Sequence, residues 1–168
     1  MDFVIANAEK NTLSSTEKTN KYTVDNYHVD INSENDSHSI IARHALGSRQ
    51  ILDVGCGVGY IGRAIKENQD CNIDGIDIDK PAIEIAKKYY NKTYLMKIGD
   101  KADKTFLNFL KNSKKYDCII CGDIIEHLPD PGYIISILVK KLSPGGKILV
   151  SIPNIAHIDV IANLRWAI

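Results

Sequence analysis

Four aspartates end or directly follow apolar segments of this chain. Read in order along the sequence, they are Asp53, Asp77, Asp100 and Asp123. A carboxylate accepts hydrogen bonds from hydroxyl and amino groups and attracts cationic groups. If the apolar segments are neighbouring strands of one sheet, their ends predict a shared site for a ligand that carries such groups.

A glycine-rich turn follows the first of these segments. The stretch from Ile51 to Tyr60 reads ILDVGCGVGY. Gly57, Gly59 and Gly62 satisfy the G-x-G-x-x-G pattern of dinucleotide-binding turns. Asp77 follows Gly57 by 20 positions (77 − 57), where such turns have the acid that binds ribose. This pattern alone favours an NAD enzyme.

The charge of Asp53 argues against a dinucleotide. A pyrophosphate would lie against the turn and the helix N-terminus that follows it, and an aspartate in contact would cost about 1 to 4 kcal/mol. S-adenosylmethionine has no phosphate and carries an ammonium, a sulfonium and a carboxylate on an adenosine. The backbone N–H groups of the turn suit that carboxylate, and Asp53 suits the ammonium, directly or through water. Asp77 would then accept both ribose hydroxyls, and Asp100 the adenine amino group.

Strand and helix patterns alternate along the chain and must position these residues. Strands are expected at 49–55, 72–78, 93–100, 116–124 and 147–154, and helices at 36–46, 60–68, 79–91, 103–113 and 131–142. The sequence SPGG is expected to form a turn before the last strand. Apolar strands separated by helices predict a doubly wound α/β domain with a mostly parallel sheet, which binds ligands beyond the carboxyl ends of its strands. Residues 1–26 are expected to form a flexible arm before a domain at 27–168.

The composition is that of one globular domain. The chain has 168 residues, and 21 Lys and Arg balance 21 Asp and Glu, so no net field favours nucleic acid or an anionic membrane. No apolar stretch reaches the roughly 18 residues of a membrane span, and the N-terminus lacks a signal-peptide pattern, so a cytoplasmic protein is expected. Cys118 and Cys121 form a C-x-x-C, but their apolar surroundings predict buried structural cysteines rather than a metal or redox site.

Five motifs resemble, in order and spacing, those of class I S-adenosylmethionine-dependent methyltransferases: ILDVGCGVG, GIDID, IGD, YDCIICGDIIEHLPDP and LSPGGKILVSIPN. The resemblance covers roughly residues 27–157 and implies S-adenosylmethionine as cofactor and S-adenosylhomocysteine as product. The candidate cofactor-binding residues are Tyr27, Asp53, Gly55, Cys56, Gly57, Gly59, Asp77, Ile78, Gly99, Asp100 and Asp123, and no metal ligands are predicted. The segments YHVDINSENDSHSII and SIPNIAH are also similar to a subgroup found with bacterial sugar and polysaccharide biosynthesis. That similarity implies a small-molecule or saccharide acceptor.

The resemblance further implies an in-line attack of an acceptor O, N or C on the sulfonium methyl group, for which alignment is the protein's main contribution. A hydroxyl acceptor must also lose a proton. His127, with Glu126 beside it, is the best general-base candidate, and packing of the loop is the alternative. Tyr27 is expected to close over the methionyl group or to anchor the core. Asn154 and His157 are candidates for acceptor contact, although ending the last strand is the favoured role.

Complete domains of this family have seven strands. The 15 residues after Pro153 (168 − 153) are too few for the remaining helix and strands, so the sheet is expected to be truncated after its fifth strand. The exposed sheet edge and apolar surface would then favour self-association as a homo-oligomer. Three functions remain open: a methyltransferase, a non-catalytic cofactor-binding fragment, and, less favoured, an NAD-dependent oxidoreductase.

Overall fold

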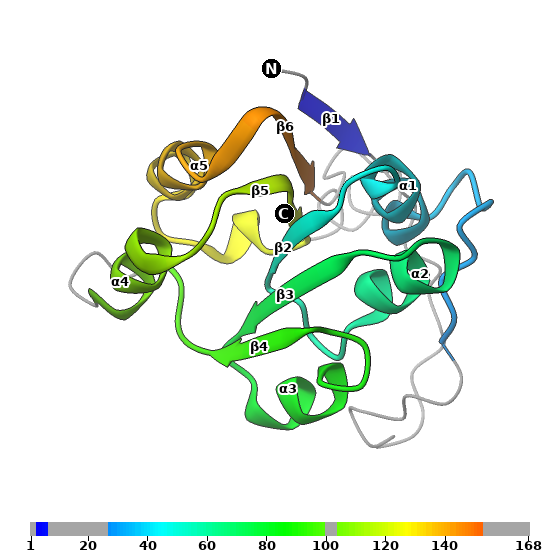
Figure 1. Ribbon diagram of the computed structural model, residues 1–168, viewed down its shortest axis with the longest axis horizontal. Coiled ribbons are helices and arrows are strands. Elements are labelled where there is room, and N and C mark those ends of the chain that lie inside the picture. The colour runs from blue at the N-terminus through cyan, green and yellow to red at the C-terminus, as the bar shows by residue number, and fades with distance from the viewer. Residues whose placement is uncertain (1–2, 7–26, 100–103, 153–168) are drawn as a thin grey trace, which may run out of the picture.

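The central sheet has six strands in the order β1-β6-β5-β2-β3-β4 (Figure 1). The structure is a computed structural model that describes residues 3–6, 27–99 and 104–152. Every strand pairing in the sheet is parallel. The strands are β1 (Phe3–Ala6), β2 (Gln50–Val54), β3 (Asn72–Asp77), β4 (Lys92–Leu95), β5 (Tyr116–Gly122) and β6 (Leu142–Ser151).

Helices cover both faces of this sheet (Figure 1). One face is covered by α1 (Ser37–Ala45), α2 (Tyr60–Asn68) and α3 (Lys80–Ala86), and the other by α4 (Lys104–Asn112) and α5 (Pro131–Val139). A 3-10 helix, η1 (Ile125–His127), follows β5. This arrangement confirms the doubly wound α/β fold predicted from the alternating pattern. None of the helices among the described residues is long and apolar enough to cross a membrane.

Two separate hydrophobic cores result from the alternation of side chains along the strands. Ile51 packs in the core beneath α1, α2 and α3, and its neighbour Leu52 packs in the core beneath α4 and α5. Cys118 and Cys121 follow the same rule, because an odd separation places them on opposite faces of β5. Both are free and buried, so they cannot share a metal ion or a disulfide with each other.

Aspartate side chains set the starts of α1 and α3. The carboxylate of Asp36 accepts the N–H of Ser39 at 2.8 Å and caps α1. Asp79 caps α3 through the N–H of Ala82, with proline in the first turn of that helix. These caps satisfy N–H groups that lack a partner inside the helix.

Three strand predictions need correction. The arm expected over 1–26 contains a strand, β1, which pairs with β6 in register from Phe3↔Ile148 to Ala6↔Ser151. The edge of β6 that was expected to be exposed is therefore paired, while residues 7–26 lie outside the described part of the chain. β4 ends at Leu95 rather than at position 100. SPGG lies inside β6, which begins at Leu142, and forms an irregular part of its pairing with β5.

Candidate functional site

The strand order reverses at β2, which has β3 on one side and β5 on the other. The chain leaves β2 and β5 in opposite directions, and such a switch point is where open α/β sheets bind ligands. The glycine turn after β2 lies there, with positive φ angles of 79° at Gly55, 53° at Gly57 and 91° at Gly59. These left-handed conformations explain why the turn is built from glycine.

The three glycines of the turn differ in what surrounds them. A Cβ atom at Gly55 would lie 2.8 Å from Cγ1 of Ile124, and one at Gly59 would lie 2.7 Å from Cε2 of Tyr90. A Cβ atom at Gly57 would meet no other atom within 4 Å. Gly55 and Gly59 are therefore required by packing within the protein, whereas Gly57 presents its backbone to open space.

Four N–H groups of the turn donate to acceptors within the protein. Gly55 and Cys56 both donate to the carbonyl of Ile76, at 2.8 and 3.0 Å, and Gly59 donates to Cys56. The N–H of Gly57 donates to Oδ2 of Asp77 at 2.7 Å. These four N–H groups hold the turn against itself and the end of β3, and the binding of a ligand carboxylate by the turn stays a prediction.

Asp77 holds the turn and the next helix together. Its Oδ2 accepts the N–H of Gly57, and its Oδ1 accepts the N–H of Asp79 at 2.8 Å. Each carboxylate oxygen has a second lone pair for a ligand donor. Ile78 follows it with 65% of its surface exposed. The end of β3 thus presents an oriented carboxylate beside a large apolar side chain.

Asp53 lies beneath the turn rather than on its surface. It is 2% exposed, and its Oδ2 accepts the hydroxyl of Tyr90 at 2.6 Å. Burial, and to a smaller extent the charge of Asp77, raises the pKa of Asp53 to about 7, against the lowering effect of the Tyr90 hydrogen bond. A substantial fraction of Asp53 is therefore protonated at neutral pH. The charge argument against pyrophosphate, which assumed an ionised carboxylate, is weaker than the sequence predicts.

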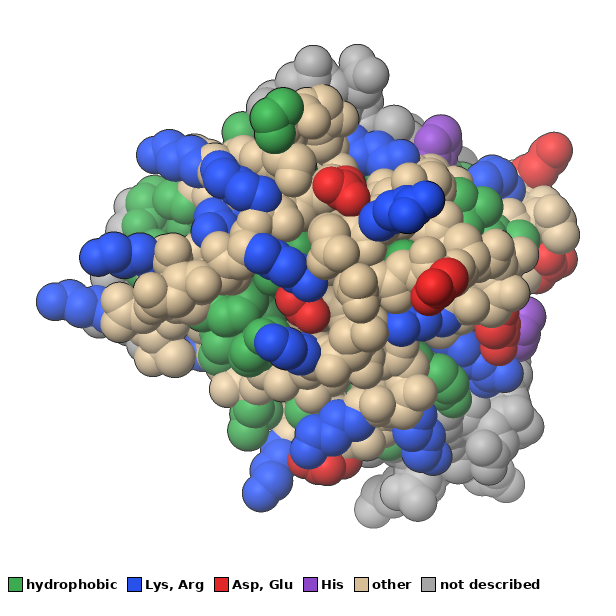
Figure 2. Space-filling view, viewed as in Figure 1, with side chains coloured by type: hydrophobic (Ala, Val, Ile, Leu, Met, Phe, Trp, Pro, Cys, Tyr) green, Lys and Arg blue, Asp and Glu red, His purple; other side chains and the backbone are tan. Residues whose placement is uncertain are grey.

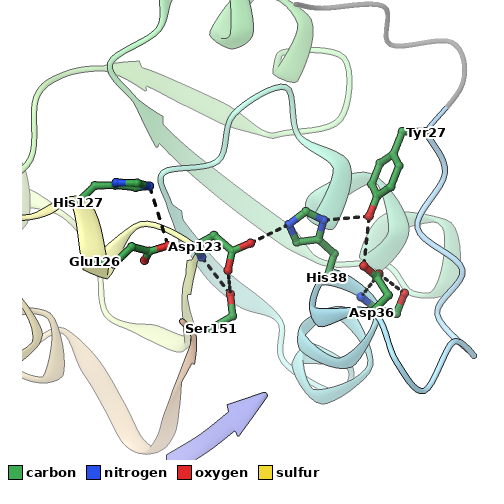
Figure 3. Close-up of polar contacts among 8 residues, drawn as sticks. Tyr27, Asp36, His38, Asp123, Glu126, His127 and Ser151 are labelled. Atoms are coloured by element: carbon green, nitrogen blue, oxygen red, sulfur yellow. Dashed lines mark hydrogen bonds and ion pairs between the residues drawn. The ribbon is translucent and has the colours of Figure 1, made fainter. Parts of the chain in front are cut away.

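A chain of polar contacts crosses the other side of the switch point (Figure 3). Asp123 follows β5 with a φ of 50°, the only positive φ among the described residues other than glycine. The hydroxyl of Ser151 accepts the N–H of Asp123 at 2.9 Å and donates to its Oδ1 at 2.8 Å. Nε2 of His38 lies 3.7 Å from the other carboxylate oxygen of Asp123. Nδ1 of His38 lies 3.1 Å from the hydroxyl of Tyr27.

Glu126 and His127 lie at the outer end of this row of residues (Figure 3). Nε2 of His127 is 3.9 Å from Oε1 of Glu126, and its side chain is 72% exposed. Gly99 packs nearby against Leu128 and Pro129 and has a φ of 97°. The structure thus places Asp123, Glu126 and His127 near one another after β5, and their roles in the site stay predictions.

Some predicted residues lie outside the described part of the chain. These are Asp100, Asn154 and His157, whose roles stay predictions. In turn, sequence reasoning missed His38, Tyr90 and Ser151. His38 and Tyr90 occur within or just after segments that read as ordinary amphipathic helices, and only their tertiary partners distinguish them.

Two lysines beyond the ends of α4 and α5 donate to backbone carbonyls. Lys141 Nζ donates to the carbonyl of Ser113 at 2.7 Å, and Lys115 Nζ donates to the carbonyl of Lys140. On the face shown in Figure 2, Lys and Arg side chains are spread out, with Asp and Glu side chains among them. These two lysines therefore have partners within the protein. That the chain binds no nucleic acid stays a prediction.

The fold and this site are those of a doubly wound α/β domain with a glycine turn and carboxylates at the switch point of a parallel sheet. A family model described as a methyltransferase domain matches residues 16–167. The chain therefore belongs to the methyltransferase domain family, which confirms the resemblance of its motifs to class I S-adenosylmethionine-dependent methyltransferases.

Several known proteins are similar to this chain. A ubiquinone biosynthesis O-methyltransferase of Coxiella burnetii (strain Dugway 5J108-111) is 30% identical over 109 residues, which cover 65% of this chain and 45% of the relative. The enzyme of the same name from Pasteurella multocida (strain Pm70) is 32% identical over 128 residues, covering 69% and 52%. The chain thus spans about half the length of these relatives. The plantazolicin methyltransferase BpumL, solved in complex with SAH, has the same fold, with a TM-score of 0.55 and 23% identity over 69% of this chain and 45% of that one.

Proposed function

We propose that this chain binds S-adenosylmethionine at the carboxyl ends of β2, β3 and β5 and transfers its methyl group to an oxygen of a small-molecule acceptor, leaving S-adenosylhomocysteine. Membership of the methyltransferase domain family supports the reaction class. The relatives named O-methyltransferases support an oxygen acceptor. The observation that carries the proposal is the contact between Asp77 and Gly57, which orients a carboxylate beside an open stretch of glycine backbone.

The cofactor is proposed to lie across this contact. The second lone pairs of Asp77 would accept the two ribose hydroxyls, and the exposed side chain of Ile78 would pack against the adenine ring. The N-cap residue of α2, Gly59, has no side chain to cap the helix, and the N–H of Gly62 in the first turn donates to a side chain, the hydroxyl of Tyr90. The start of α2 would attract the methionyl carboxylate through the helix dipole and the N–H groups of its first turn.

Methyl transfer itself needs little chemistry from the protein. The acceptor oxygen attacks the methyl carbon, the carbon–sulfur bond breaks, and its electron pair stays on sulfur. Alignment of the two reactants can contribute up to about 7 to 11 kcal/mol. Glu126 and His127 are proposed to contact the acceptor, because they lie on the exposed rim beyond Asp123. A saccharide acceptor, which the subgroup resemblance implied as an alternative to other small molecules, remains within this proposal.

Calorimetric titrations with S-adenosylmethionine, S-adenosylhomocysteine and NAD test the cofactor. We expect binding of the first two and none of NAD, and binding of NAD alone would contradict the proposal. Formation of S-adenosylhomocysteine is then measured with catechol, with glucose and with a primary amine as acceptors. Binding without turnover on any acceptor would favour the alternative of a non-catalytic cofactor-binding fragment. That alternative is considered because the chain spans only about half the length of its relatives.

A further inference from the structure

We propose that Tyr27, His38 and Asp123 form a proton relay in which Tyr27 contacts the acceptor hydroxyl and His38 receives the proton. This inference rests on the proposed methyl transfer to oxygen and identifies the groups that would remove the acceptor proton. The relay joins residues from three places in the chain: the segment before α1, α1 itself, and the turn after β5 (Figure 3).

The hydrogen bonds define what His38 can do. The hydroxyl of Tyr27 lies 3.1 Å from Nδ1 of His38 and 3.2 Å from Oδ1 of Asp36. Tyr27 has one proton, so it donates to only one of these partners at a time. When it donates to Asp36, Nδ1 of His38 carries a hydrogen and donates to the Tyr27 oxygen. When it donates to His38, the imidazole can take that proton completely, because Asp123 then faces the resulting cation at Nε2.

Asp123 is held in place for this role. Its left-handed backbone conformation is uncommon for a residue with a side chain, although Asp adopts it more readily than most. Ser151, at the end of β6, bonds both its N–H and its Oδ1. Its second oxygen is thereby turned toward His38. A base oriented by a carboxylate, itself oriented by a hydroxyl, is a common arrangement for proton transfer.

Tyr27 is also fixed, and it lies beside the proposed cofactor. Its ring packs edge-on against Tyr60, with the ring centroids 4.7 Å apart, and Tyr60 directly follows the glycine turn. Arg43 holds the segment before α1 by donating to the carbonyls of Ile31 and Ser33 at 2.8 and 3.2 Å. On the other side, Ile124, next to Asp123, contacts Gly55 of the turn. The relay therefore spans the turn where the methyl group would be presented.

The proposed step balances protons and charge. The acceptor oxygen gives its proton to the Tyr27 oxygen while Tyr27 gives its own proton to Nδ1 of His38. The acceptor oxygen attacks the methyl carbon, and the sulfonium becomes a neutral thioether. The positive charge lost from sulfur appears on the imidazole, opposite Asp123. Tyr27 never ionises in this sequence, so its pKa, which burial and Asp36 raise to about 12, does not oppose the transfer.

Nitrogen-detected spectra of the histidine rings test the relay without any acceptor. In the protein bound to S-adenosylhomocysteine, Tyr27→Phe is expected to shift the Nδ1 signal of His38, and Asp123→Asn its Nε2 signal. Asparagine suits this test because it tolerates a positive φ. The signals of His44, an exposed histidine in the same helix, serve as the control. Unchanged His38 signals in both variants would overturn the relay, whatever the enzyme's substrate.

Kinetics separate proton removal from a structural role. With catechol, His38→Gln is expected to lower kcat about 100-fold, within the range of general-base effects, and to leave the Kd for S-adenosylhomocysteine within about twofold. With 4-nitrocatechol, whose acidic hydroxyl is already ionised near neutral pH, most of that loss should disappear. His44→Gln should resemble the wild type.

Three results would overturn the assignment. An equal loss of kcat with both catechols would give His38 a structural role, and a loss confined to His127→Gln would make His127 the base. A tenfold or greater loss of cofactor affinity in His38→Gln would place His38 in cofactor binding. If the wild-type chain methylates neither catechol, the oxygen acceptor of the proposed function is what fails on these probes, and the ring spectra decide the relay.

Discussion

The hydroxyl oxygen of Tyr90 lies 2.6 Å from Oδ2 of Asp53 and accepts the N–H of Gly62 at 3.2 Å. The ring fits into a slot formed by Gly59, Gly62 and Gly75, because a Cβ atom at any of them would come within 3.0 Å of it. Two glycines of the G-x-G-x-x-G pattern therefore serve the packing of one tyrosine. Part of the glycine pattern that suggested a dinucleotide-binding turn is therefore explained by the packing of Tyr90.

Gly62→Ala is expected to affect mainly stability, and Gly57→Ala mainly cofactor binding. Gly62→Ala forces its Cβ into the buried Tyr90 ring and is expected to destabilise the fold by about 1 to 3 kcal/mol. Gly57→Ala meets no atom and costs only the strain of its φ of 53°, about 1 to 2 kcal/mol, but it adds a methyl group where the cofactor is proposed to approach. Thermal unfolding and calorimetric titration measure both. A larger loss of affinity in Gly62→Ala would contradict the proposed cofactor position.

The pKa of Asp53 predicts how stability changes with pH. Because its pKa is raised from 3.8 to about 7 by burial, the folded protein keeps a proton that the unfolded chain has already released in this range. The stability contributed by the protonated form is therefore lost as pH rises from about 4 to about 7. At 1.36 kcal/mol per tenfold change in proton affinity, this loss is on the order of 4 kcal/mol.

Asp53→Asn should remove most of that dependence, since the amide oxygen still accepts the Tyr90 hydroxyl and cannot ionise. Urea unfolding at pH 4 and pH 8 measures the difference. Asp70→Asn, at an exposed position, is the matched control and should leave the dependence unchanged. The same slope in Asp53→Asn and in the wild type would show that Asp53 is ionised in the fold.

Asp77→Ala is expected to weaken cofactor binding by roughly 1.5 to 3 kcal/mol, through loss of the charge-assisted hydrogen bonds to the ribose. The alanine also removes the acceptor of the Gly57 and Asp79 N–H groups. Asp77→Asn keeps one oxygen acceptor and so separates loss of charge from loss of the turn. Unchanged affinity in both variants, measured by calorimetry, would remove Asp77 from the site. Glu84→Ala, which loses only a surface pair with Lys87, is the control.

The four cysteines should be unreactive in the folded protein. All are free and buried, and burial raises the pKa of Cys118 to about 12. Thiolates react with disulfide reagents, so we expect modification only on the timescale of unfolding. Ser136→Cys, at an exposed position on α5, supplies a fast-reacting reference thiol in the same protein. A disulfide between Cys118 and Cys121 under oxidising conditions would contradict their placement on opposite faces of β5.

Local patterns in the sequence were sufficient for most of the fold. The buried strands β2, β3 and β5 are short apolar runs, and the caps Asp36 and Asp79 set the starts of α1 and α3. The extent of β6 was not predictable, because SPGG reads locally as a turn and is recruited to the strand by pairing with β5. β1 was missed because a strand of four residues carries too little pattern to be recognised.

The carboxylates of the site could be predicted from the sequence, but their hydrogen-bond partners could not. The positions of Asp77 and Asp123 follow from strand ends, which a sequence displays. The Tyr90–Asp53 and Ser151–Asp123 contacts join residues 37 and 28 positions apart, so they depend on how the elements pack. The same packing buries Asp53 and raises its pKa, so the charge of this residue cannot be inferred from the sequence.

The irregularity within β6 determines which way the end of that strand faces. Between Tyr116↔Leu142 and Cys118↔Lys147, β6 advances five positions while β5 advances two, and from there to Gly122↔Ser151 the pairing stays in step. A net slip of one residue beyond this point would point Ser151 to the opposite face of the sheet and away from Asp123. The SPGG segment thus determines which residues of β6 face each side of the sheet. The orientation of Ser151 at the end of β6 therefore depends on an irregular sequence near the start of that strand.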